Sequence, residues 1–123
     1  METTPKAINF AEKISGIGDL WQPRVIAEMN DYQFKLVRIE GDFIWHDHPE
    51  TDETFIVLSG RLRIDFRHGA VVIGPGEMAV VPKGLEHKPY AESEVHLLLI
   101  EPRGTLNTGH EGGERTAQND VWA

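Results

Sequence analysis

Two short segments decide the fold of this chain: Trp45-His46-Asp47-His48-Pro49-Glu50-Thr51-Asp52-Glu53 and Pro82-Lys83-Gly84-Leu85-Glu86-His87. The first segment holds two histidines two residues apart, and a β-strand places such residues on the same face. Glu53 follows after a turn composition, so its carboxylate can approach the same point from the neighbouring strand. His87 lies beyond a second turn, on yet another strand. The spacing predicts that four side chains converge: His46, His48, Glu53 and His87.

Three neutral imidazoles and one carboxylate form a borderline-soft ligand set. Such a set suits a divalent Fe, Zn, Ni, Mn, Co or Cu ion rather than Ca or Mg. If the geometry is octahedral, four protein ligands leave two positions open, and open positions distinguish a catalytic metal from a structural one. The sequence therefore predicts a divalent transition metal held by these four side chains.

Short runs rich in Val, Ile, Leu and Phe recur along the chain, and each ends in a turn composition such as Gly41-Asp42 or Glu92-Ser93-Glu94. Strands at this nearly regular spacing predict an all-β sandwich or barrel. The expected strands are Arg24–Met29, Gln33–Ile39, Phe43–His46, Thr54–Leu58, Arg61–Phe66, Ala70–Ile73, Met78–Val81, Glu86–Tyr90 and Val95–Glu101.

The chain of 123 residues is expected to form a single domain, 1–123, with its barrel core over about 24–101. Phe10, Ile14 and Ile17 recur at helical spacing after a possible cap, which predicts at most a short N-terminal helix within Asn9–Ser15. Residues 104–123 have a loop-like composition and form a predicted C-terminal tail.

Composition limits the possible partners. The chain has no cysteine, so neither disulfides nor thiolate metal sites are available. With 12 basic and 20 acidic residues, the formal charge is −8 and the basic residues are scattered, which argues against binding nucleic acid. The N-terminal residues contain no apolar run for a signal peptide or membrane span, so we expect a cytoplasmic protein that binds no membrane.

The two segments also resemble a known family. The run Gly41-(four residues)-His46-x-His48-(four residues)-Glu53-(six residues)-Gly60 resembles the first motif of small single-domain cupins. The run Gly76-(five residues)-Pro82-x-Gly84-(two residues)-His87 resembles the second. Two departures stand out: the first motif usually has five residues before its first histidine, and Ala91 replaces the asparagine that usually closes the second motif.

The resemblance implies a double-stranded β-helix, the jelly-roll or cupin barrel, with the metal inside and a small-molecule substrate entering at the open end. It also implies a homodimer formed through the outer β-sheet or an N-terminal strand. Both segments are similar to small cupins loosely labelled as like mannose-6-phosphate isomerase. That label expresses a superfamily relation, because fold alone does not fix function.

Strand alternation predicts which neighbours of the ligands face the metal. Ile44, Phe55 and Val57 are predicted to share the metal-facing side, with Phe55 and Val57 lining a pocket, whereas Phe43, Trp45 and Asp47 are predicted to point away.

For His96, Arg61 and Arg63 the sequence leaves two locations open, one beside a ligand and one away from it. His96 lies in an apolar strand and either contacts a ligand or takes an ordinary strand position, and the pattern favours the latter. Arg61 and Arg63 share a strand face that either meets an anionic substrate or, as the pattern favours, lies in solvent. No role is assigned to Glu50, Asp52, Glu86, His68 and His110, the last two being expected on the surface.

Three functions remain open. The first is a metal-dependent enzyme of the isomerase, epimerase or lyase type, acting on a small polar organic molecule. The second is an Fe(II)-dependent dioxygenase. The third is a non-catalytic module that binds or senses a small ligand. The sequence supplies metal ligands but no clear general base, so the reaction type and the catalytic residues stay unassigned.

Overall fold

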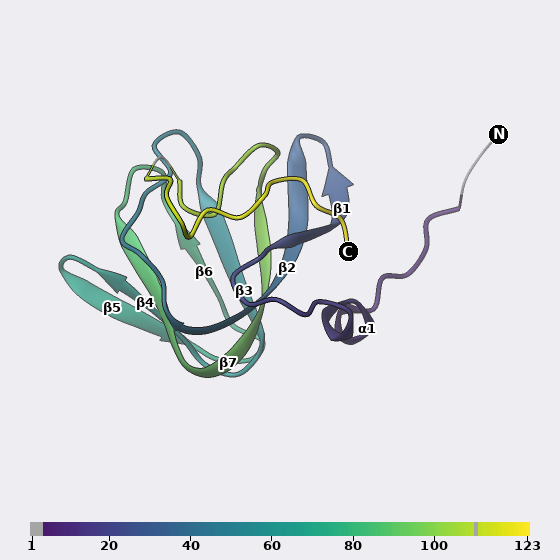
Figure 1. Cartoon of the computed structure of the whole chain (residues 1–123), viewed down its shortest axis with the longest axis horizontal. Coiled ribbons are helices and arrows are strands. Elements are labelled where there is room, and N and C mark those ends of the chain that lie inside the picture. The colour runs from purple at the N-terminus through teal and green to yellow at the C-terminus, as the bar shows by residue number, and fades with distance from the viewer. Residues whose placement is uncertain (1–3, 110) are drawn as a thin grey trace.

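The computed structural model describes residues 4–109 and 111–123 (Figure 1), so the expectation for His110 lies outside the described residues. Along this part of the chain, one short helix precedes a series of strands. In chain order they are α1 (Phe10–Ser15), β1 (Arg24–Met29), β2 (Tyr32–Asp42), β3 (Glu53–Ser59), β4 (Leu62–Phe66), β5 (Gly69–Ile73), β6 (Met78–Val81) and β7 (His87–Pro102).

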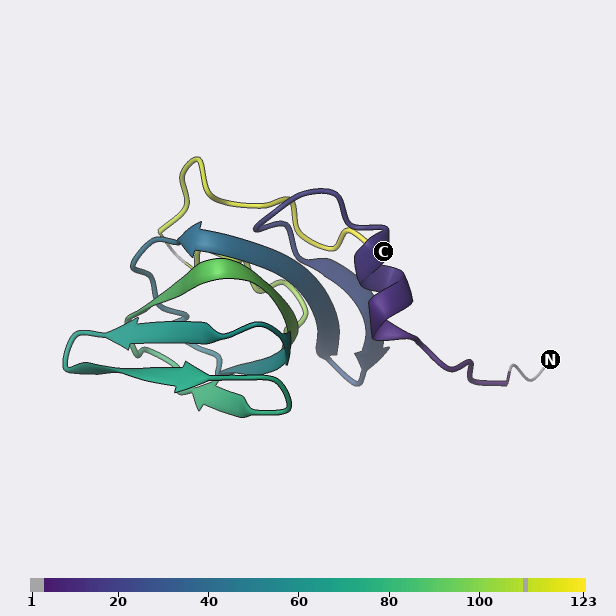
Figure 2. The ribbon, with the colours of Figure 1, turned by 90° about the horizontal axis from the view of Figure 1, so that it is seen from below.

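The strands form an antiparallel sheet organised around β7. The sheet order is β1-β2-β7-β3-β6, and β4 pairs with both β5 and β7. The first part of β7 pairs with β4, and its last part lies between β2 and β3. The sheet therefore curls around a common interior, as the two views in Figures 1 and 2 show. The prediction of an all-β jelly-roll barrel is confirmed.

The curled sheet has an apolar cluster on each face. Inside the barrel, residues such as Val37, Val57 and Leu97 are almost fully buried. On the outer face, Leu36 and Leu98 pack with residues of α1 and its flank. Burial on both faces explains why the central strands read as nearly continuous apolar runs.

The predicted N-terminal helix is confirmed as α1. The Asn9 side chain accepts a hydrogen bond from the backbone N–H of Glu12 at 2.9 Å, which caps the first turn. Ile14 and Ile17 are buried against the outer face of the sheet. The helix therefore covers the β1–β2 side of that face (Figure 2).

Three expected strands differ in the structure. Phe43–His46 is an extended segment with a single bridge, between His46 and His87, rather than a strand. Glu86–Tyr90 and Val95–Glu101 are parts of one strand, β7, so the predicted turn at Glu92-Ser93-Glu94 is wrong. The chain stays extended here because it pairs with β2 and β4 before Glu92 and with β2 and β3 after Glu94. This pairing outweighs the turn composition of the stretch.

The C-terminal tail crosses one end of the barrel, where Figure 1 shows it in yellow. It then returns to β1, where the backbone N–H of Val25 donates to the carbonyl of Val121 at 2.8 Å. The buried amide of Gln33 donates to the Asp120 carboxylate at 2.8 Å, and Lys35 donates to the Asn119 side chain at 3.4 Å. Polar contacts from β2 therefore hold the tail over the barrel.

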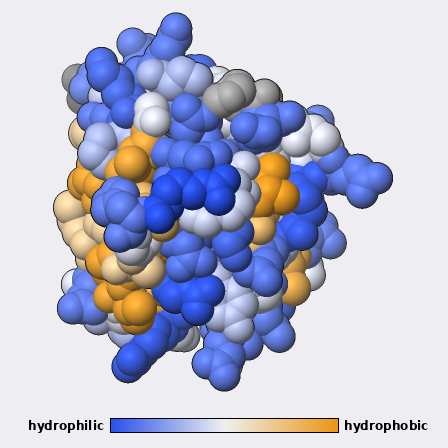
Figure 3. Space-filling model, turned by 90° about the vertical axis from the view of Figure 1, so that its left-hand side faces the viewer, coloured by the Kyte–Doolittle hydropathy of each residue, from blue (hydrophilic) through white to orange (hydrophobic). Residues whose placement is uncertain are grey.

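The β4–β5 side of the molecule is mostly hydrophilic, with separate hydrophobic patches (Figure 3). Arg61 and Arg63 lie here and are exposed, and the Arg63 guanidinium lies 4.3 Å from the centre of the Tyr90 ring. Both arginines therefore lie on the solvated outer face, which is the alternative that the sequence pattern favours. Among the described residues, no helix is long and apolar enough to cross a membrane.

Candidate metal centre

The four predicted ligands come together inside the barrel. His46 and His48 lie on the extended segment after β2, Glu53 begins β3, and His87 begins β7. One donor atom from each lies within 4.8 Å of the others, and all four side chains are buried. Since the described residues bring three imidazoles and one carboxylate to one point, the cluster could hold a divalent metal.

Backbone carbonyls orient two of the imidazoles. Nδ1 of His46 lies 2.9 Å from the Ile44 carbonyl oxygen, and Nδ1 of His87 lies 2.9 Å from that of Leu85. A ring N–H that donates to a carbonyl fixes the tautomer, which leaves Nε2 as a lone-pair donor. Both rings are therefore held as metal-binding histidines usually are.

The facing atoms of the cluster lack ordinary partners. Oε1 of Glu53 lies 3.3 Å from Nε2 of His48 and 3.4 Å from Nε2 of His87, yet these three atoms are buried without a hydrogen bond. Buried polar atoms are nearly always paired, so this arrangement calls for a bound cation or water. The donor set and the unpaired atoms fit a divalent transition metal.

The charge of the cluster favours metal binding. Burial alone would raise the pKa of Glu53, but contacts with His48 and His87 outweigh it and hold the pKa well below its usual range. Burial, followed by the neighbouring His87, lowers the pKa of His46 to about 4. An ionised carboxylate beside a neutral imidazole is the protonation state that a divalent cation requires.

The metal-free protein should lose stability as the pH falls from 6.5 to 4. The unfolded chain binds a proton at His46 near pH 6.5, whereas the folded chain does so only near pH 4, so acid favours unfolding in this interval. The free energy of unfolding should fall by roughly 3 kcal/mol from this group. Urea titrations in EDTA at several pH values would measure it, and a slope unchanged in His46→Gln would contradict the assignment.

Behind the cluster lie a buried lysine, Lys35, and a buried acid, Glu101. Neither was predicted from the sequence as a site residue. Lys35 Nζ lies 2.9 Å from Oε1 of Glu101, and both side chains are almost fully buried. Burial, followed by the charge of Glu53, raises the pKa of Glu101 well above its usual range. Two buried carboxyl groups, Glu53 and Glu101, therefore lie close enough to influence each other's pKa. The signal in the sequence was a charged residue next to apolar residues in each of two strands: Lys35 before Leu36-Val37, and Glu101 after Leu97-Leu98-Leu99-Ile100.

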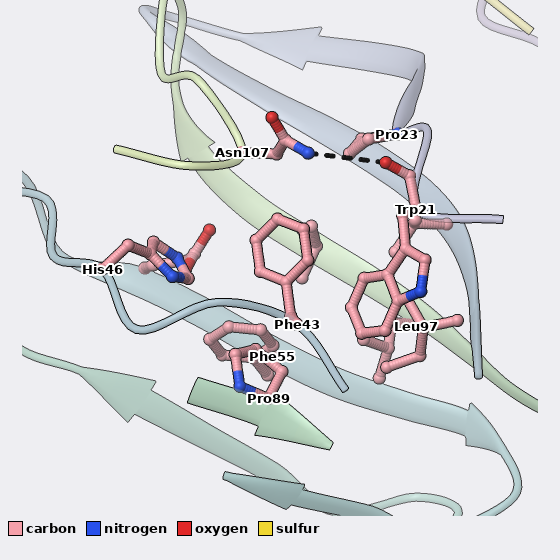
Figure 4. A pocket seen from close by; sticks show the side chains of 12 residues that line it. Trp21, Pro23, Phe43, His46, Phe55, Pro89, Leu97 and Asn107 are labelled. Atoms are coloured by element: carbon pink, nitrogen blue, oxygen red, sulfur yellow. Dashed lines mark hydrogen bonds between the residues drawn. The ribbon is translucent and has the colours of Figure 1, made fainter. Parts of the chain in front are cut away.

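An apolar pocket adjoins the cluster (Figure 4), and two of the four clustered residues, His46 and Glu53, line it. Phe55 lines it as predicted, whereas Val57 is core and Ile44 does not line it. Apart from His46, Glu53 and Asn107, every residue that lines the pocket is apolar. The centre therefore faces a largely apolar chamber.

The prediction that Phe43 points away from the metal side is wrong. It lines the pocket, where its ring meets His46 edge-on at 5.3 Å and stacks on Trp21 at 4.7 Å. Residues 43–45 are not part of a regular strand, so the alternation that holds for His46 and His48 does not extend back to Phe43. Trp45 does lie away from the pocket, with the Arg67 guanidinium 3.8 Å from its ring centre.

The tail closes the pocket. The Asn107 side chain lines it and donates to the carbonyls of Trp21 at 3.4 Å and Arg115 at 2.9 Å (Figure 4 shows the first bond). Gly109 packs tightly against the Asp47 carbonyl, on the segment that carries the two histidines. The tail is thus part of the site, a role that the sequence left open.

Gly109→Ala should release the tail from the site. Gly109 has φ +59°, and a Cβ there would overlap the Asp47 carbonyl oxygen. Gly112→Ala is the matched control, because Gly112 has φ +66° and open space around it. Both variants carry the backbone cost of about 1–2 kcal/mol, but only Gly109→Ala should also increase acrylamide quenching of Trp21 fluorescence. Equal quenching in both variants would contradict tight packing of the tail.

The remaining candidates lie elsewhere. His96 does not line the pocket, and its Nε2 lies 2.7 Å from the Glu94 carboxylate, which also pairs with Arg38. Glu86 is half-buried and pairs with Arg67, and His68 is exposed, as expected. Asp52, to which no role was assigned, accepts a hydrogen bond from the backbone N–H of Lys83 at 2.9 Å. That bond joins the two motif segments.

Known structures share this architecture. A cupin-2 domain containing protein from Shewanella frigidimarina is 57% identical, with a TM-score of 0.77 over 78% of this chain and 94% of that one. A protein from Neisseria meningitidis is 38% identical, with a TM-score of 0.73 over 79% of this chain and 99% of that one. A hydroquinone 1,2-dioxygenase is only 19% identical at a TM-score of 0.68, which shows the shared fold alone.

Comparison of amino-acid sequences gives the same family as the structural matches. The Bacillus subtilis protein YdbB is 41% identical over 64 residues, a match that spans 51% of this chain and 57% of YdbB. The family described as "Cupin domain" matches residues 35–101, which include all four clustered side chains. The barrel, the two motifs and these matches together show that the chain belongs to the cupin domain family.

Proposed function

We propose that His46, His48, Glu53 and His87 bind a divalent transition metal and that this cupin is a metal-dependent enzyme acting on a small molecule. The observation that carries the proposal is the set of buried, unpaired nitrogen and oxygen atoms in a cluster that adjoins a pocket through His46 and Glu53. Because His46 and Glu53 line that pocket, the open coordination positions are expected to face it.

The pocket favours oxidative chemistry over isomerase, epimerase or lyase chemistry. A bound divalent ion would supply a Lewis acid or, if it is iron, electrons for oxygen chemistry. Proton-transfer reactions also need a general acid or base beside the substrate. Among the described residues that line the pocket, only His46 and Glu53 titrate, and both belong to the metal cluster. An Fe(II)-dependent dioxygenase therefore fits these walls best.

Elemental analysis of untagged protein, purified without added metal, tests the metal centre. Nearly one equivalent of a transition metal per chain is expected, followed by oxygen uptake with small enols or diketones when the metal is iron. Zinc, nickel or manganese without oxygen uptake would point instead to isomerase or lyase chemistry. A protein that binds no transition metal, even when the metal is supplied, would overturn the proposal and leave a binding or sensing module.

A homodimer through the outer sheet face is also proposed. Met78 and Val80 on the edge strand β6 are about half exposed. They pair with Ile56 and Thr54, and Ile56 packs in the outer apolar cluster, so the apolar face continues beyond α1. Exposed apolar area on an edge strand typically marks an association surface.

Sedimentation should therefore give a mass near twice 13.9 kDa at micromolar concentration. Met78→Lys should shift the protein toward the monomer, because a charge would be buried without a partner. The matched control is Val72→Lys, an exposed apolar residue on β5, outside that face. A monomeric wild-type protein would contradict the dimer.

A further inference from the structure

The polar groups available to a ligand in the pocket are confined to its metal end. Asn107 has little left to offer, because its NH2 group donates to Trp21 and Arg115 and its oxygen accepts from the backbone N–H of Ala117 at 2.8 Å. Among the described lining residues, only His46 and Glu53 are otherwise polar. A ligand therefore meets its polar partners at one end only.

Apart from Asn107, the walls outside the metal cluster are apolar. Val37 and Leu97 come from paired strands, and Phe43 stacks on Trp21 (Figure 4). A hydroxyl or charged group placed against these walls would lose its water without gaining a partner. Each such hydroxyl would weaken binding roughly tenfold or more.

The chamber is also small. Its cavity volume is about 40 Å³, and one water needs roughly 10–15 Å³ of such volume, so the space corresponds to about three waters. Trp21 and Asn107 both line it, and the Asn107 side chain donates to the Trp21 backbone carbonyl at 3.4 Å. The part of a ligand beyond its metal-binding atoms must therefore be short.

We infer that the ligand of this centre is a small oxygen-donor molecule, such as an enol or keto acid, whose remainder is short, uncharged and apolar. Sugar phosphates and polyols are disfavoured, because their hydroxyl and phosphate groups would lie against the apolar walls. The inference rests on the proposed metal centre. It differs from the expectation from the sequence, which was a small polar organic molecule.

A matched pair of probes tests this preference. Propionohydroxamate and glycolohydroxamate carry the same chelating group and the same number of heavy atoms, and they differ only in a methyl replaced by a hydroxyl. Titration of the cobalt-loaded protein, followed by visible absorption, gives both affinities, with aqueous Co(II) as the reference. After this correction, propionohydroxamate should bind at least about tenfold more tightly.

Two valine variants locate the preference in the pocket wall. Val37 and Val57 are both buried in the inner core, but only Val37 lines the pocket. Val37→Thr should reduce the affinity ratio several-fold, whereas Val57→Thr should leave it unchanged. Equal binding of both probes to the wild-type protein would overturn the ligand preference alone. If the cobalt-loaded protein binds neither probe, the proposed function is overturned with it.

Discussion

His87→Ala should lower the affinity for divalent transition metals by at least about tenfold, because loss of a direct ligand costs no less than loss of a supporting one. The same holds for His46→Ala. In both variants the remaining side chains keep their places, since the backbone at His46 and His87 is paired by two hydrogen bonds of 3.0 and 2.8 Å. Competition with a fluorescent chelator on untagged protein measures the affinities.

Two controls separate loss of a ligand from general damage. His96→Ala removes a histidine outside the pocket and should leave metal affinity unchanged. Chelation of the metal from wild-type protein should leave the far-ultraviolet circular dichroism intact, because the apolar clusters form the core. Stoichiometric metal at unchanged affinity in both His46→Ala and His87→Ala would refute the ligand set.

Lys35→Met should destabilise the fold by about 3–5 kcal/mol, the typical effect of breaking a buried ion pair from one side. Lys35 is the buried cation beside Glu101, and it also donates to the Thr105 carbonyl at 3.2 Å. Its loss leaves the buried carboxyl group of Glu101 without its cation and frees one tail contact. Urea unfolding monitored by circular dichroism gives the free energy of unfolding.

The surface pair of Lys88 and Asp42 supplies the matched control. Their atoms lie only 2.6 Å apart, but the Asp42 side chain is 64% exposed, so Lys88→Met should cost at most about 1 kcal/mol. Adding Glu101→Leu to Lys35→Met should recover part of the lost stability, because the unpaired acid is removed. Similar costs for Lys35→Met and Lys88→Met would show that burial does not strengthen the inner pair.

Part of the predicted ligand set could be read from the sequence because its geometry is local. Two histidines two residues apart share a face whenever the chain is extended, even though the segment that carries them is not a regular strand. The turn at Pro82-Lys83-Gly84 then delivers His87 beside His46. Local rules were sufficient for His46 and His48, whereas the two motifs and their resemblance to cupins indicated that His87 meets them from a distant part of the chain.

The same local rules failed where distant segments decide the outcome. Glu92-Ser93-Glu94 has a turn composition, but β7 runs through it because neighbouring strands pair with both ends of this stretch. Phe43 was predicted on the wrong side because alternation assumes a regular strand. In each case hydrogen bonding to another segment outweighed the local preference.

The sequence by itself determined the all-β class and the short helix, since periodicity and turn chemistry act over neighbouring residues, and its two motifs indicated that His46, His48, Glu53 and His87 converge. Only the tertiary structure decided what surrounds that cluster. The buried pair of Lys35 and Glu101 is 66 residues apart in the chain, and the pocket combines residues from both ends of it. Such contacts depend on how curled strands and a returning tail meet, which no local pattern encodes.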